Sequence, residues 1–196
     1  MKVIFFTFAI LMIITSIPSI NSDIGFGRCK VQPSPNVVQN FDLPKYMGKW
    51  YEQFRASKVP FQKGECTTAD YTLKDNYVEV LNSEFKEGAT ERNSVLGKAV
   101  CPSTDAKCKV SFGTSIFSKF TEGNYWVYET DYQNYSIVYS CTEYFYLYHL
   151  EFVWVLTRDR NPSEAIRVKI ADALKNLKYP VEDIRHRTYH GDDCIY

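Results

Sequence analysis

Cysteine and histidine are the residues of this sequence most able to carry covalent or metal chemistry, with six copies of the first and three of the second. His149 stands alone, but His186 and His190 lie four residues apart, a spacing that can hold zinc on a helix. Their neighbours Arg187 and Tyr189 indicate an extended tail instead, so we interpret both as surface histidines. The sequence has no Cys-x-x-Cys pair and no Gly-x-Ser-x-Gly elbow. We therefore expect neither a metal site nor serine catalysis.

An even number of cysteines is typical of a secreted protein in which every cysteine is paired. Several pairings are open, and the residues alone select none of them. Cys101 and Cys108 flank Pro102 and are close enough in sequence for a local bridge across a turn. Complete pairing leaves no free thiolate, which argues against an enzyme that uses a pocket cysteine. The six residues are Cys29, Cys66, Cys101, Cys108, Cys141 and Cys194.

Residues 1–22 have the organisation of a secretory signal peptide. Met1-Lys2 precedes an apolar run from Val3 to Ile17, and small polar residues follow as far as Ser22. The run is shorter than the ~20 residues that span a bilayer, which favours a cleaved signal over the alternative, a retained anchor. No later segment is apolar enough to cross a membrane. We expect residues 23–196 to form a secreted domain.

The mature chain is long enough for one domain with a sizeable core and short for two. The whole chain has 23 basic and 23 acidic residues, so loss of Lys2 leaves a net charge of about −1 without a long run of either sign. Phosphate binding needs a concentrated basic patch. We therefore do not expect nucleic acid as a partner.

Aromatic residues are abundant, with 15 Tyr, 13 Phe and 3 Trp, and they occur in short runs bounded by turn residues. This pattern is typical of an all-β protein. Eight antiparallel strands closed into an up-and-down barrel would have no exposed edges and would enclose about one small ligand. A sandwich is the competing architecture. The expected strands are Trp50–Ser57, Cys66–Leu73, Tyr77–Phe85, Thr90–Val100, Lys109–Phe112, Asn124–Thr130, Tyr135–Tyr144 and Glu151–Arg158.

One segment near the carboxyl terminus has helical periodicity instead. We expect Asn161 as its N-cap, Pro162 as its first helical residue, Glu164 in its first turn and Tyr179-Pro180 as its end. Its apolar residues recur at helical spacing, so one face should pack on the outside of the barrel. These residues are Ile166, Ile170, Ala173, Leu174 and Leu177.

Three short signals are suited to closing one end of such a barrel. They are Gly48-Lys49-Trp50, Thr130-Asp131-Tyr132 and Arg158. If they meet, Arg158 can lay its guanidinium over the Trp50 ring while Thr130-Asp131-Tyr132 forms the neighbouring turn. The opposite end would stay open. A barrel closed at one end is a container for a small apolar molecule.

With their neighbours, these signals resemble the lipocalin family, and within it the branch of apolipoprotein D and the insect bilin-binding proteins. The resemblance covers essentially the whole mature chain and implies an eight-stranded barrel with one external carboxyl-terminal helix. It also implies the disulfides Cys29–Cys141 and Cys66–Cys194, which leaves Cys101–Cys108 by subtraction. The matching stretches are Asn40-Phe41-Asp42, Lys45–Glu52, Thr130–Tyr132, Asn134–Thr142 and Glu151–Arg158 with the helix that follows.

Strand phase and the resemblance together predict the ligand-binding residues. If Arg158 turns inward, then Leu156, Trp154 and Phe152 share its face at a period of two residues. Tyr71 and Tyr125 are added because similar sequences place pocket aromatics there, and their hydroxyls could orient a carbonyl or carboxylate. The alternative for each of the five is plain core packing.

The resemblance also places four loops around the open end, and all of them carry apolar residues. Such a rim could contact a lipid surface or a partner protein, or its side chains could fold inward over the core. The single Asn-x-Ser/Thr site, at Asn134, falls at the closed end, where a glycan would lie clear of the opening. The rim residues are Val59-Pro60-Phe61, Phe85, Phe117, Phe120 and Tyr144–Tyr148.

These features together predict a secreted carrier that binds and transports or stores a lipid, steroid, fatty acid or bilin in its barrel. We expect no enzyme activity and no required cofactor; a noncovalent bilin or another hydrophobic ligand is the small molecule implied. The alternative function is a scaffold that acts mainly through protein contacts, as a pigment-complex subunit, an inhibitor or a receptor ligand.

Overall fold

The computed structural model describes residues 24–29, 37–56, 62–86, 88–113, 122–145, 147–177 and 186–196. The expected signal peptide lies outside these residues, as do Val59-Pro60-Phe61, Phe117, Phe120, Tyr146 and Tyr179-Pro180. The elements in chain order are β1 (Ile24–Phe26), α1 (Leu43–Tyr46), β2 (Gly48–Arg55), β3 (Glu65–Leu73), β4 (Val78–Phe85), β5 (Asn93–Val100), β6 (Lys107–Phe112), β7 (Gly123–Thr130), β8 (Tyr135–Tyr144), β9 (Tyr148–Thr157), α2 (Glu164–Leu177) and β10 (His186–Arg187).

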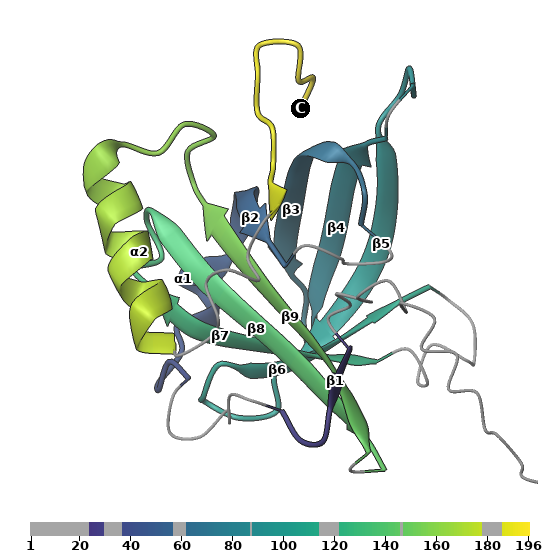
Figure 1. Cartoon of the computed structure of the whole chain (residues 1–196), viewed down its shortest axis with the longest axis vertical. Helices are drawn as coiled ribbons and strands as arrows, with labels where there is room; N and C mark the ends of the chain where they lie inside the picture. The colour runs from purple at the N-terminus through teal and green to yellow at the C-terminus, as the bar shows by residue number, and fades with distance from the viewer. Residues whose placement is uncertain are drawn as a thin grey trace, which may run out of the picture.

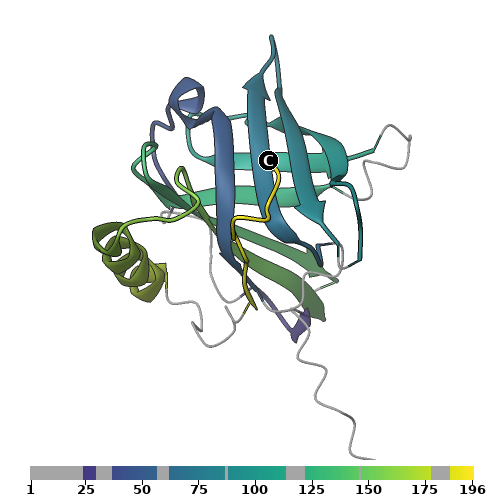
Figure 2. The same ribbon diagram turned by 90° about the horizontal axis from the view of Figure 1, so that it is seen from above.

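Strands β2 to β9 form a closed antiparallel barrel. Each strand pairs with the next along the chain, and β9 returns to pair with β2, with Tyr51 opposite Thr157 and Arg55 opposite Trp154. Figure 2 shows these strands curving around a common interior, with α2 outside it. The closure excludes the sandwich and confirms the eight expected strands, whose ends shift by only a few residues.

Two short elements, β1 and α1, were not expected from the sequence, whereas β10 lies in the tail that was expected to be extended. β1 adds to β9 and β10 adds to β2, and with three and two residues they are too short for an alternating pattern. The four-residue helix α1 likewise has no helical repeat. It is held by its N-cap, because the Asp42 carboxylate accepts the N–H of Lys45 at 3.2 Å while Pro44 occupies the first turn. α1 brings the buried Tyr46 to one end of the barrel.

α2 packs on the outside of the barrel, as the sequence predicted, and lies along the outer face of β8 (Figure 1). Its start differs from the expected one: α2 begins at Glu164, and the carbonyl of Ser163 accepts the N–H of Arg167 at 3.0 Å. Asn161 is therefore not the N-cap, because the first carbonyl to accept a helical hydrogen bond belongs to Ser163. Neither described helix is long and apolar enough to cross a membrane. The buried residues of α2 are Ile170, Ala173, Leu174 and Leu177.

The helix explains why β8 is buried on both faces over most of its length. Outward side chains such as Ile137 and Tyr139 pack with α2 and with Val153 and Val155 of β9. Inward side chains such as Val138 pack with the aromatic residues of the barrel base. A strand with two covered faces reads as a nearly continuous apolar run, as this one does.

All six cysteines are paired, in the pattern that the resemblance implied. Cys29–Cys141 and Cys66–Cys194 join residues 112 and 128 positions apart, whereas Cys101–Cys108 spans 7. In the loop-entropy model each long-range bridge restricts the unfolded chain by roughly 3 to 5 kcal/mol. The first bridge ties the amino-terminal segment to β8, and the second ties the carboxyl-terminal tail to β3.

Candidate functional site

The barrel encloses a cavity of about 780 Å³. Side chains from every strand between β2 and β9 line it, so the cavity occupies the interior and not a surface groove. Its volume lies within the range of small-molecule binding sites, about 300 to 1,000 Å³. All five residues expected to bind the ligand are among those that line it: Tyr71, Tyr125, Phe152, Trp154 and Leu156.

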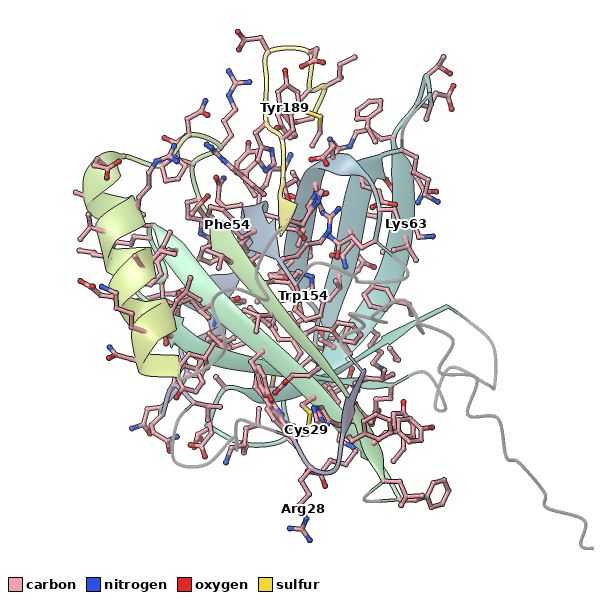
Figure 3. The ribbon with its side chains drawn as sticks, in the orientation of Figure 1. Arg28, Cys29, Phe54, Lys63, Trp154 and Tyr189 are labelled. Carbon is pink, nitrogen blue, oxygen red and sulfur yellow. A yellow bond between two sulfur atoms is a disulfide. The ribbon has the colours of Figure 1, made fainter. Side chains whose placement is uncertain are left out.

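The alternation along β9 places three of these residues. Phe152, Trp154 and Leu156 line the cavity, while Val153 and Val155 between them pack toward α2. The rings of Phe152 and Trp154 lie 5.7 Å apart at 40° and present an aromatic surface from one strand. Figure 3 shows Trp154 near the middle of the barrel. The three residues that line the cavity thus recur at the period of two on which the prediction rested.

Arg158 closes the base of the barrel. Its guanidinium carbon lies 3.7 Å from the centre of the Trp50 ring. The same group donates to the carbonyls of Tyr132, Lys49 and Tyr46 at 3.1, 2.9 and 3.2 Å. Three chain segments that are distant in sequence are thus joined by one side chain, and the indole of Trp50 is fully buried beneath it.

Gly48 and the turn after β7 give this closure its shape. Gly48 has a φ of 91°, in the region that favours glycine, and a Cβ there would lie 3.4 Å from the Arg158 Nη1. In the turn, Thr130 Oγ1 donates to the carbonyl of Tyr135 at 2.6 Å and accepts the N–H of Tyr132 at 3.0 Å. Both features hold the main chain where Arg158 meets it.

Asp131 organises the same turn through its carboxylate. Its Oδ1 accepts the backbone N–H groups of Gln133, Asn134 and Tyr135, and its Oδ2 accepts the side-chain amide of Asn134 at 2.8 Å. Burial acts to raise the pKa of this carboxyl, but the hydrogen bonds outweigh it and the pKa is lowered. The amide nitrogen of Asn134, the atom that would carry a glycan, is thus half-buried and hydrogen-bonded.

A chain of hydroxyl groups lies between the base and the cavity. The Tyr46 hydroxyl bonds to Ser136 Oγ at 2.8 Å and to the Tyr125 hydroxyl at 3.0 Å, which in turn bonds to Tyr71 at 2.9 Å. Burial raises the pKa of Tyr46 to about 12 and also raises the pKa of Tyr71 and Tyr125. The three phenols are therefore neutral donors that first satisfy one another. Tyr46 and Ser136 were not predicted as part of this cluster.

A second polar cluster forms the wall on the side of β2, and the sequence reasoning missed it. Glu52 accepts hydrogen bonds from Arg55 at 2.5 Å, from Thr188 of the tail at 2.6 Å, and from Gln62. Gln62 in turn accepts the indole N–H of Trp154 at 3.1 Å. Burial, the largest influence, raises the pKa of the Glu52 carboxyl against the attraction of Arg55. Glu52 shares the inward phase of Trp50, which was the signal available in the sequence.

The β8–β9 hairpin and β1 carry large apolar side chains into solvent. Phe26 is 97% exposed, Phe145 85% and Leu147 70%. Tyr144 and Tyr148 stack at 5.0 Å beneath the hairpin tip. Because the strands alternate in direction and Arg158 marks the base, this hairpin lies at the open end. In this described part of the rim, Phe145 and Leu147 project into solvent, whereas Tyr144 is half-buried and lines the cavity.

The histidines are less exposed than expected for the surface. His186 Nε2 lies 3.0 Å from a carboxylate oxygen of Glu65, and His190 Nε2 lies 2.5 Å from the carbonyl of Glu52. Burial lowers the pKa of both imidazoles. His149 is buried on the outside of the barrel, where its Nδ1 lies 3.1 Å from the carbonyl of Gly27. These contacts fix the tail and β1. Among the described residues, no group of His, Cys, Asp or Glu is arranged to hold a metal.

The fold and this cavity define the class of the protein. Residues 41–189 match the model of the lipocalin-like domain. The chain belongs to the lipocalin family, as its motifs indicated.

Three related proteins align with about two thirds or more of this chain. Apolipoprotein D of Cavia porcellus is 38% identical over 160 residues, which cover 80% of this chain and 80% of that protein. Apolipoprotein D of Mus musculus is 44% identical over 138 residues, 68% and 67% of the two chains. The Lazarillo protein of Schistocerca americana is 38% identical over 146 residues, 72% and 66%.

Solved structures share the fold at lower identity. Insecticyanin from Manduca sexta aligns with a TM-score of 0.73 at 22% identity, over 88% of this chain and 92% of its own. Lobster apocrustacyanin A1 aligns with a TM-score of 0.73 at 22% identity, over 91% and 95%. Similarity at this level establishes the barrel architecture.

Proposed function

We propose that this protein is a carrier that holds one small hydrophobic molecule noncovalently inside its barrel. The observation that supports this role is the interior cavity of about 780 Å³, closed at its base and lined by aromatic and aliphatic side chains. Covering ~300 Å² of apolar ligand surface at ~25 cal/mol/Å² contributes roughly 7 kcal/mol before the cost of association. That is enough for micromolar affinity in a preformed pocket.

The ligand contacts are assigned to the five residues that strand phase and family resemblance predicted. Phe152, Trp154 and Leu156 supply an apolar wall, and Tyr71 and Tyr125 supply hydroxyls near the base. The cysteines do not support an enzyme mechanism based on a free thiol, because all six are in disulfides. The three disulfides and the expected signal peptide favour secretion.

Ligand content of the native protein is the direct test of a carrier. The secreted protein is purified without organic solvent, its visible spectrum is recorded, and an organic extract is analysed by mass spectrometry. A bilin would give colour, whereas a lipid or steroid would appear only by mass. One molecule per chain is the expected stoichiometry. An extract without any apolar small molecule, together with no uptake of added ligand, would contradict the proposal.

A substitution in the cavity should weaken ligand binding. Phe152→Ala removes a ring whose burial is worth about 1.5–3 kcal/mol, so the Kd should rise by about tenfold or more. Val168→Ala, on the exposed face of α2, is the control and should leave the Kd unchanged. Equal changes in Kd for the two substitutions would show that Phe152 does not contribute to ligand binding.

The exposed tip at the open end supports an additional role, contact of the carrier with a lipid surface. Phe26, Phe145 and Leu147 have the exposure and apolar character of residues that enter the boundary of a bilayer. The double variant Phe145→Ser, Leu147→Ser should lose flotation with phosphatidylcholine vesicles while it keeps its ligand affinity. Unchanged flotation would favour the scaffold function, in which the same tip meets a protein.

Asn134 is proposed as a glycosylation site at the end opposite this tip. Its motif is intact, and its amide nitrogen keeps one hydrogen for Asp131 after modification. The intact mass of the secreted protein before and after glycosidase treatment tests this. An unchanged mass would show that the site is unoccupied.

A further inference from the structure

The charged side chains that line the described part of the cavity are all acidic. They are Glu52 on β2, Glu84 on β4 and Glu122 directly before β7. No lysine, arginine or histidine belongs to the lining that the structure describes. The cavity is the binding site already proposed, and these carboxyl groups bear on which polar group of a ligand it accepts.

The cation that pairs with Glu52 is Arg55, which lies in the barrel wall and not in the cavity lining. It is 2% exposed and lines the cavity, whereas its partner Arg55 does not. The guanidinium of Arg55 is held in the wall, because it also donates to the carbonyl of Gly64 at 3.0 Å. Glu52 therefore contributes hydrogen-bond acceptors to the cavity wall, one of them shared with Gln62, and brings no cation of Arg55 to the cavity.

Glu84 is a buried carboxyl held by main-chain donors. It is 6% exposed, and its Oε2 accepts the backbone N–H groups of Gly64 at 2.9 Å and Lys63 at 3.2 Å. Lys63 is itself exposed, and in Figure 3 it lies apart from Trp154, which is at the centre of the barrel. Backbone amides stabilise a carboxylate without removing its charge. Glu84 thus brings a negative group to the cavity from the side opposite β8 and β9.

The base of the cavity does not supply a cation either. The Arg158 guanidinium is directed at the carbonyls of Tyr132, Lys49 and Tyr46, and Arg158 is absent from the described lining. The groups that the cavity meets there are the phenols of Tyr71 and Tyr125, whose pKa burial raises, so they stay neutral. Glu122, at the opposite end, is bound to Lys109 at 2.9 Å.

We infer that the cavity selects ligands whose polar group donates hydrogen bonds and is neutral or positively charged, such as an alcohol or amine, over ligands that carry a carboxylate. The inference rests on the proposed carrier function and narrows its ligand class. A carboxylate placed near Glu84 meets like charge in a medium of low dielectric constant, and near Glu52 it meets only hydrogen-bond acceptors. An O–H or N–H group instead gains a charge-assisted hydrogen bond.

Retinol and retinoate form a matched pair for the test, because they share one polyene and differ in an alcohol against a carboxylate. Quenching of tryptophan fluorescence reports both Kd values. We expect retinol to bind at least about tenfold more tightly than retinoate at neutral pH, a ratio that a single buried like-charge contact can produce. Nile red, a neutral dye, serves as a probe of the cavity itself.

Glu84→Gln is the informative variant, because the amide oxygen of glutamine can still accept the two backbone N–H groups and preserve the fold. It should reduce the preference for retinol by about fivefold or more, mainly by tightening retinoate. Glu79→Gln is the matched control on the same strand, where Glu79 pairs with Lys74 at 3.3 Å on the outer face. This control should leave the ratio unchanged.

The results separate the inference from the carrier function. Equal Kd values for retinol and retinoate, or a ratio that Glu84→Gln does not change, would overturn the inference and leave the carrier role intact. Uptake of Nile red without binding of retinol would overturn it as well. Failure of the dye and of both retinoids to bind would count against the carrier function itself.

Discussion

The two ends of the barrel differ in how their side chains are paired and exposed. At the base, Arg158 covers the buried Trp50 ring and donates to four carbonyl groups, so aromatic, cationic and main-chain groups are all paired. At the open end, Phe145 and Leu147 project into solvent without such partners. The difference is that dense hydrogen bonding closes one end of the barrel, whereas exposed aromatic and aliphatic side chains border the end through which the proposed ligand would enter.

The carboxyl-terminal tail holds the open end together in place of a continuous ladder. β2 pairs with β3 only from Gly48 to Tyr51, and farther along β2 its partner is β10. Thr188 continues this contact through its N–H to the carbonyl of Gln53 at 3.0 Å and through its hydroxyl to Glu52. The tail therefore fills the gap between β2 and β3 and contacts the cavity wall.

The two kinds of disulfide provide the largest expected contrast between the ends. Replacing Cys66 and Cys194 by serine releases the tail at the open end and should lower the free energy of unfolding by about 5 kcal/mol. Replacing Cys101 and Cys108 at the base should cost only about 2 kcal/mol, because the loop they close is short. Urea unfolding without reductant measures both. A larger loss of unfolding free energy on removing Cys101–Cys108 would contradict the expectation that the open end depends more on its disulfide.

The second contrast is between a buried and an exposed apolar residue. Trp50→Ala should lower the free energy of unfolding by about 3–5 kcal/mol, because it leaves a cavity under Arg158. Leu147→Ala at the open end should change it by less than about 0.5 kcal/mol. Thermal and urea unfolding of the two variants provide the comparison. Similar losses for both would mean that the hairpin tip is part of the stable core.

The smallest expected contrast is in pH dependence. The pKa of Asp131 at the base is lowered from its usual 3.8, so its stabilisation is complete above that pH and is lost as pH falls through the lower folded value. The pKa of Glu52 in the wall is raised from 4.5, so stability should fall as pH rises from that value through the higher folded one.

Two variants separate these opposite slopes. Asp131→Asn should flatten the loss of stability in acid, and Glu52→Gln should flatten the loss above pH 4.5. Urea unfolding across a pH series gives both slopes. If Asp131→Asn keeps the full acid slope, the carboxylate of the turn is not its source.

Strand phase was sufficient for much of the interior. Phe152, Trp154 and Leu156 could be assigned to the cavity because alternation is a local property of an extended chain. The outer helix was found for the same reason, although it starts at Glu164 and not at Pro162. A shift of two residues in the start does not alter the helical repeat of the apolar residues.

The polar part of the site was not predicted, because its members come from distant segments. Thr188 reaches Glu52 across 136 residues of sequence, and Tyr46 reaches Ser136 across 90. Nothing in the neighbourhood of either residue in the sequence marks such a partner. The exposure of the hairpin tip was equally undecided, since Phe145 and Leu147 have the composition of a core.

The sequence by itself determined the barrel strands, the external helix, the residues that close the base and the apolar side of the cavity. These depend on periodicity and on short motifs, which are local. Only the tertiary structure decided that buried glutamates face the ligand space, that the two nearby arginines are turned to other partners, and that the tail supports the wall. Charge, burial and hydrogen-bond partnership are properties of a packed environment, and that environment exists only after closure brings the strands together.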